Sequence, residues 1–109
     1  MRALCLLLCF SLAIDAAAAE AASAPTPERR HELIRLVRQD CGSCHGMTLK
    51  GGLGLPLLPD SLRDKPAASL VATVVHGRPG TPMPAWKTIL AEGEAEWIVS
   101  QLLTGFPSE

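Results

Sequence analysis

The chain has 109 residues and a formal net charge of −1. This length allows one domain, and the near-neutral charge excludes the strongly basic surfaces by which proteins bind nucleic acid or anionic membranes. Aromatic residues make up only 4% of the chain and tyrosine is absent, so a core this poor in large side chains is expected to need a covalent staple or a bound apolar group.

Residues 1–19 are predicted to be a secretory signal peptide. An apolar run follows Arg2, extends to Ile14 and gives way to small residues, which is the order typical of such signals. The run is shorter than the roughly 20 residues that span a bilayer, so we expect an exported chain without stable membrane insertion after cleavage; an uncleaved anchor is the alternative. Residues 20–26 are predicted to be a flexible lead-in and residues 27–109 the folded domain.

The first helix of that domain is predicted from Pro27 to Asp40. Thr26 suits the N-cap and proline suits the first helical position. Four apolar residues at helical spacing are expected to share one face, and they are Leu33, Ile34, Leu36 and Val37.

The segment CGSCHGMTLKGGLGLPLLPD, residues 41–60, is predicted to be a loop. It contains five glycines and two prolines, which do not favour a regular element. Its leucines need an apolar body to cover, and the following DSLRDK is expected to form one short turn.

Two more helices are predicted, and strand-like alternation is absent from the sequence. One opens at Pro66 and stops at Gly77; its apolar residues are expected on one face, namely Leu70, Val71, Val74 and Val75. The other runs from Glu92 to Leu103 and ends at Gly105, with Ala95, Ile98 and Leu102 on one stripe. The predicted fold class is therefore all-α with long loops.

The pattern C-x-x-C-H at residues 41–45 is the attachment signal of c-type haem. Two cysteines three positions apart can form thioethers with the two vinyl groups of one porphyrin, and the next histidine then lies beneath the iron. We therefore expect one covalent haem c, with Cys41 and Cys44 as attachment points and His45 as an axial ligand.

Other interpretations of the two cysteines are weaker. A disulfide between them would close a very short loop and stabilise little, and a thioredoxin-like motif needs a βαβ context. A zinc site would need two ligands from His31, His45 and His76, whose spacing matches no usual zinc pattern.

The sixth iron ligand is predicted to be Met83. It lies 38 positions after His45, ample chain to circle a haem, and prolines on both sides stiffen its backbone. Met47 is too close to His45 to reach the other side of the ring. His31 is interpreted as a solvated residue. His76 is interpreted as a residue at the carboxyl end of a helix, where the helix dipole stabilises a partly charged imidazole.

Residues around the ligands are predicted from the surrounding sequence. A ligand histidine normally donates its second N–H to a fixed acceptor, and the carbonyl of Leu55 or Pro56 is the candidate. Arg78 and Trp86 flank the Met83 segment, and either could donate to a haem propionate; a solvated arginine and a core tryptophan are the equal alternatives. Residues expected to line the haem or the helices around it are Leu53, Leu57, Leu58, Leu70, Val74, Ile89 and Trp97.

Residues 27–104 resemble a class I monohaem cytochrome c, in the order helix, CGSCHG, Gly/Pro loop, helix, TPMP and last helix. That resemblance implies a cytochrome c-type fold of three to five helices wrapped around one covalently attached haem. CGSCHGMTLKGGLG followed by GRPGTPMPAW is similar to the small periplasmic cytochromes that accompany the haem c/haem d-type nitrite reductase of denitrifying bacteria, and to the cytochrome c domains of that reductase and its relatives.

The resemblance implies a monomeric one-electron carrier in the periplasm, not an enzyme, whose partners are an upstream electron donor and nitrite reductase. The alternative is an accessory factor in maturation of the special d-type haem of that reductase. An enzymatic haem is a third possibility, and it would require the sixth ligand to leave the iron.

Overall fold

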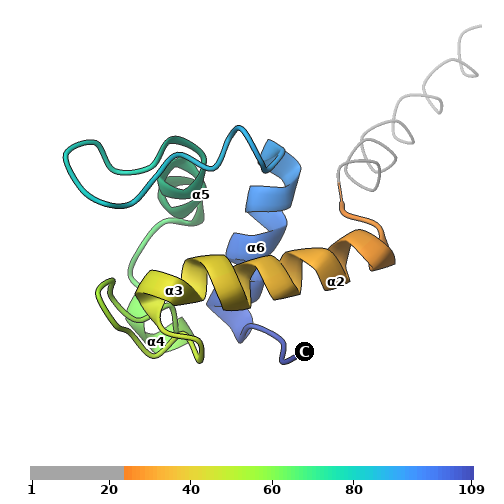
Figure 1. The fold of residues 1–109 in the computed structure, drawn as a ribbon, viewed down its shortest axis with the longest axis horizontal. Coiled ribbons are helices and arrows are strands. Elements are labelled where there is room, and N and C mark those ends of the chain that lie inside the picture. The colour runs from red at the N-terminus through yellow and green to blue at the C-terminus, as the bar shows by residue number, and fades with distance from the viewer. Residues whose placement is uncertain (1–23) are drawn as a thin grey trace, which may run out of the picture.

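The computed structural model describes residues 24–109, so the predicted signal peptide and most of the lead-in lie outside the described residues. Residues 24–109 contain helices and no strand, which confirms the all-α prediction (Figure 1). The elements are α2 (Pro27–Leu36), η1 (Val37–Cys41), α3 (Gly42–His45), α4 (Pro59–Leu62), α5 (Ala67–His76) and α6 (Glu92–Thr104). None of the helices in this part of the chain is long and apolar enough to cross a bilayer.

The first helical segment is longer than predicted. It begins at Pro27 as expected, with Thr26 Oγ1 accepting a hydrogen bond from the backbone N–H of Arg29. It does not end at Asp40, because a π-helical turn and then α3 carry the helical path through the two cysteines to His45. The prediction of a loop from residue 41 is therefore wrong over its first five residues and holds from Gly46 onward, apart from α4.

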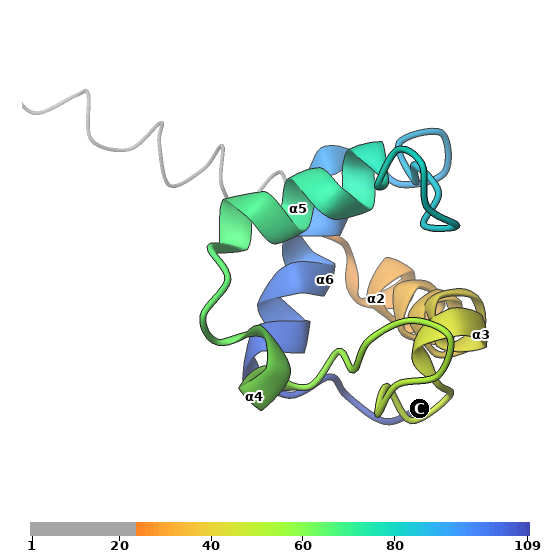
Figure 2. The same cartoon turned by 90° about the vertical axis from the view of Figure 1, so that its left-hand side faces the viewer.

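Helices α2 and α6 cross, and their apolar faces form the centre of the core (Figures 1 and 2). The side chains of Leu33 from α2 and Val37 from η1 are fully buried there together with Ile98 and Leu102 from α6. Leu49 and Leu62, from the connection between α3 and α5, complete this layer.

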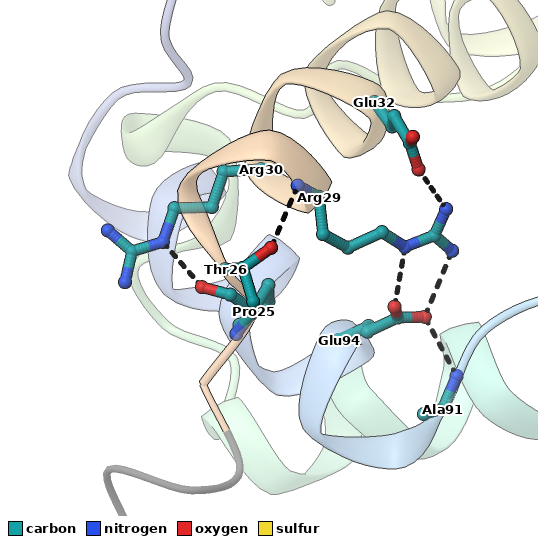
Figure 3. A network of polar contacts seen from close by, with 7 residues as sticks. All are labelled: Pro25, Thr26, Arg29, Arg30, Glu32, Ala91 and Glu94. Carbon is teal, nitrogen blue, oxygen red and sulfur yellow. Dashed lines mark hydrogen bonds and ion pairs between the residues drawn. The ribbon is translucent and has the colours of Figure 1, made fainter.

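A polar network joins the amino ends of the two crossing helices (Figure 3). Arg29 Nε donates to Glu94 Oε1 at 2.6 Å and its Nη1 to Glu32 at 2.7 Å. Glu94 Oε2 also accepts the backbone N–H of Ala91 at 3.0 Å. Glu94, the third residue of α6, thus satisfies the backbone N–H of the N-cap residue Ala91 and binds α2 at the same time.

Helix α5 ends at Gly77, as predicted. Its four predicted apolar residues lie within an arc of about 140°, at 100° per residue. Leu70 and Val74 pack against the core, and Val71 and Val75 line a groove against α6. The predicted apolar face is therefore divided between the core and this groove.

The carboxyl-terminal tail is fastened to the first helical segment. Arg38 Nη2 donates to the carbonyl oxygens of Phe106 and Pro107, at 3.1 and 2.8 Å, and its guanidinium lies over the Phe106 ring. That ring meets the indole of Trp97 edge to face, with centroids 6.5 Å apart. These contacts place the tail beside the π-helical turn that leads into the cysteines.

Candidate haem-binding site

The two cysteines and the histidine of the motif are presented by one short helical stretch. Cys41 ends the π-helical turn, and α3 carries Cys44 and His45. Both thiols are free; Cys41 packs against the core and Cys44 is exposed. Burial, with the nearby Asp40 charge, raises the pKa of the Cys41 thiol to about 11, so the free thiol is neutral.

The His45 imidazole is held by one of its two nitrogens. Nδ1 lies 2.7 Å from the carbonyl oxygen of Leu55, one of the two acceptors that the sequence suggested. In the tautomer that this bond requires, Nδ1 carries the proton and donates it, which leaves the lone pair of Nε2 available to a metal.

The loop after α3 fixes the end of this helix and the His45 imidazole. Gly51 N donates to the His45 carbonyl and Gly54 N to the Cys44 carbonyl, both at 2.8 Å, so the last carbonyl groups of α3 are satisfied. Gly54 lies against the imidazole itself: a Cβ there would come within 2.7 Å of Cε1 and Nδ1. Only glycine therefore lets the loop approach closely enough for Leu55 to accept the histidine proton.

The Met83 segment is held by backbone hydrogen bonds and by the hydroxyl group of Thr81. The Met83 carbonyl accepts the N–H of Arg78 at 3.1 Å, and Met83 N donates to Thr81 Oγ1 at 3.3 Å. Thr81 Oγ1 in turn donates to the Arg78 carbonyl at 2.6 Å. Trp86 N donates to the Val74 carbonyl at 3.0 Å, which anchors the segment to the last turn of α5.

The other residues considered as iron ligands or as neighbours of the haem differ in their exposure. Arg78 is exposed, whereas the indole of Trp86 packs against the core. Met47 is 61% exposed, and His31 and His76 are exposed. Pro56 is half-buried beside Gly51.

The apolar residues expected around a haem divide into two groups, apart from Leu58, which is half-buried outside the core cluster. Leu57, Leu70, Val74 and Trp97 pack against the core. Leu53 and Ile89 do not, since they are 95% and 58% exposed. These two leave a large apolar surface uncovered on the loops that carry Leu55 and Met83.

Thr81 and Gly54 were not singled out from the sequence, although both position a candidate ligand. A threonine two residues before a loop residue often accepts its backbone N–H, so the TPM string contained a local signal for Thr81. The role of Gly54 depends on the contact of its Cα with a side chain nine positions earlier, and the local sequence contains no trace of that contact.

The donor set fits a covalently attached haem. Two free thiols and an imidazole with Nε2 available lie on one helical stretch. In both views the Met83 segment and α3 with its following loop lie on the same side of the molecule (Figures 1 and 2). A thiol pair and an imidazole are the groups that c-type haem attachment needs.

Comparison with known proteins agrees with this chemistry. Residues 29–100 match the family model described as cytochrome c oxidase, cbb3-type, subunit III. Cytochrome c55X of Pseudomonas aeruginosa is 54% identical over 81 residues, which cover 74% of this chain and 68% of that protein.

Two solved structures are also similar. The c-type cytochrome NirC superimposes with a TM-score of 0.74 and 52% identity, covering 75% of this chain and 96% of that one. Dihydro-heme d1 dehydrogenase NirN in complex with DHE gives a TM-score of 0.62 and 37% identity, covering 69% of this chain but only 16% of that one. The family match, these identities and the motif geometry agree: the chain belongs to the c-type cytochrome family that the cbb3-type subunit III model describes, and its cofactor is covalently attached haem c.

Proposed function

We propose that the protein is an exported one-electron carrier of the periplasm whose haem iron is held by His45 and Met83. The observation that carries this proposal is the hydrogen bond from His45 Nδ1 to the Leu55 carbonyl, because it orients the ring and reserves Nε2 for iron. A haem attached at Cys41 and Cys44 supplies an iron that exchanges one electron at a time.

The residues around His45 and Met83 hold these two proposed ligands in position. Leu55 and Gly54 fix the imidazole, and Thr81 with Arg78 fixes the backbone of Met83. With His45 and Met83 both bound to it, the iron would have no ligand position left for a substrate. The soft thioether favours reduced iron and raises the reduction potential.

Replacement of the half-buried Met83 and of the exposed Met47 tests the ligand assignment. Met83→Ala is expected to abolish the weak absorption near the red end of the visible spectrum that marks methionine ligation of oxidised haem. It should also allow rapid binding of carbon monoxide after reduction. Met47→Ala is the matched control and should leave both properties unchanged; loss of the band in Met47→Ala alone would overturn the assignment.

The electron acceptor is proposed to be a nitrite reductase that carries haem c and a d-type haem. The likeness to NirC and cytochrome c55X supports this choice. Stopped-flow oxidation of the reduced protein by purified reductase should be rapid and saturable, compared with an unrelated class I cytochrome c as control. Oxidation no faster than that of the control would contradict the proposed partner.

A second function, assistance in maturation of the d-type haem, is favoured by one observation. The chain is 37% identical to part of a dihydro-haem d1 dehydrogenase, although it covers only 16% of that protein. A deletion strain separates the two functions. Reductase that lacks its d-type haem supports the maturation role, whereas fully loaded reductase that receives electrons slowly supports the carrier.

A further inference from the structure

Helix α5 is apolar on more than one side. Residues Ala67–His76 contain no aspartate, glutamate, lysine or arginine, and none of them is buried. A helix that is apolar around most of its circumference is ordinarily covered on most sides. Leu70 and Val74 pack against the core, whereas Val71 and Val75, on the neighbouring face, are only half-buried and line a groove against α6.

That face of α5 forms one wall of a groove, and α6 forms the other. The groove has a volume of about 490 Å³. Its floor is apolar and is made largely by Val71 and Val75 of α5 with Val99 and Leu103 of α6. None of the four residues proposed to hold the haem lines it, namely Cys41, Cys44, His45 and Met83.

The edge of the groove is acidic. Glu92 and Glu96, both exposed, line it at the amino end of α6. The exposed His76 lines it from the end of α5, and no lysine or arginine of residues 24–109 does so. Within residues 24–109 neither carboxylate takes part in an ion pair, in contrast to Glu94 on the same helix. An apolar floor with a one-sided negative edge selects an occupant of complementary charge.

We propose that the α5/α6 groove docks an amphipathic helix of a partner protein, with its apolar stripe on the valines and its lysine or arginine residues beside Glu92 and Glu96. Helix-in-groove recognition needs an apolar channel between two elements and anchors spaced at i, i+3 and i+7, and this groove offers the channel. A second copy of the chain would bring a second pair of carboxylates to a groove that no lysine or arginine of residues 24–109 lines. An anionic membrane surface is repelled by the same two carboxylates.

Docking in this groove leaves the proposed ligands of the haem uncovered. A partner bound there can therefore hold the cytochrome while a redox partner uses the haem. This proposal does not depend on Met83 being the sixth ligand or on nitrite reductase being the acceptor. Its failure would leave both of those assignments unaffected.

Two synthetic helical peptides of about 18 residues test the groove. Both carry leucines at helical spacing; one has lysines beside the stripe, and the other has glutamates at the same positions. With the ¹⁵N-labelled haem-loaded protein, the lysine peptide should shift the amide resonances of residues 67–76 and 92–103. It should bind at least tenfold more tightly than the glutamate peptide.

Three variants of the protein make this test specific. Ala72→Glu places a charge on an exposed groove position and should weaken binding of the lysine peptide at least tenfold. Ser61→Glu, an exposed position outside the groove, is the control and should bind as the parent does. The double variant E92K/E96K should reverse the preference between the peptides. Unchanged visible spectra would show that each variant retains its haem environment.

Three results would overturn the proposal. The first is equal binding of the two peptides, or resonance shifts confined to other regions. The second is concentration-dependent dimerisation of the parent in analytical ultracentrifugation that Ala72→Glu abolishes, which would assign the groove to a second copy. The third is sedimentation with phosphatidylglycerol vesicles that Ala72→Glu prevents, which would assign it to a membrane surface.

Discussion

Gly77 is the residue at which α5 meets the Met83 segment, and its geometry leads to a sharp prediction. Its φ is +68°, and a Cβ would come within 2.7 Å of the Met83 carbonyl oxygen and of the Pro84 carbonyl carbon. In Gly77→Ala we expect a cost of roughly 1–2 kcal/mol from the left-handed backbone, with a further cost from displacement of the segment. The free energy of unfolding of the haem-loaded protein, from denaturant titration, measures the sum.

Gly80 provides a matched control in the same loop. Its φ is +78°, but no atom lies within 4 Å of a Cβ built there. Gly80→Ala should therefore show the backbone cost alone, with the methionine absorption band intact, whereas Gly77→Ala should also weaken the band. Equal losses of stability in the two variants, with the band unchanged in both, would contradict a role for Gly77 in placing Met83.

At the scale of the elements, Arg29 and Glu94 join α2 to α6. The side chains of Arg29 and Glu94 are 34% and 18% exposed, so solvent screens the pair only in part. The hydrogen bond from Arg29 holds the pKa of Glu94 below its ordinary value. The stabilisation is therefore complete above the ordinary carboxylate pKa of about 4.3 and is lost as the pH falls through the lowered pKa of Glu94.

Arg29→Met should lower the free energy of unfolding by about 1 kcal/mol near neutral pH. The difference from the parent protein should shrink as the pH is lowered, because the protonated Glu94 of the parent no longer forms the ion pair. Arg63→Met is the control, since its pair with Asp60 is exposed on both sides, and it should change stability little. A difference that stays constant between neutral and acid pH would contradict this explanation.

The elements that the sequence predicted well are those with local signals. Thr26 and Pro27 mark the start of α2, Gly77 marks the end of α5, and Ala95, Ile98 and Leu102 are buried on α6 as their spacing predicts. Each of these features depends on a cap, a stop or a helical period that lies within a few residues.

The helical course of CGSCH was missed for the opposite reason. Its glycines favour a loop, but Gly51 and Gly54 return to bond the carbonyls of His45 and Cys44, and these bonds come from residues six and ten positions later. The division of α5 between the core and the groove was not predicted for the same reason, because the packing of α6 decides which valine meets the core. Tertiary contacts of this kind are not encoded in a local window.

At the scale of the whole molecule, the protein core is small. Among residues 24–109 nine hydrophobic residues are buried, and α5 contributes none of them. A domain of this size buries only about 60–65% of its unfolded surface and is marginally stable unaided. The exposed leucines of the loop after α3 and the exposed Ile89 beside the Met83 segment add an unfavourable apolar surface. An apolar group bound between these loops would remove that surface from water.

The haem-free double variant C41S/C44S, expressed with the same export signal, tests this dependence on haem. We expect it to lose cooperative thermal unfolding and about half or more of its far-ultraviolet helical signal, because the remaining core leaves a small domain without its apolar centre. Met83→Ala is the matched control: it retains both thioether attachments and should keep its helical signal and a cooperative transition. If C41S/C44S unfolded cooperatively at the midpoint of the haem-loaded protein, the crossed α2/α6 core would be sufficient by itself. The haem would then add redox chemistry to a fold already complete, and the apolar loops around it would need another explanation.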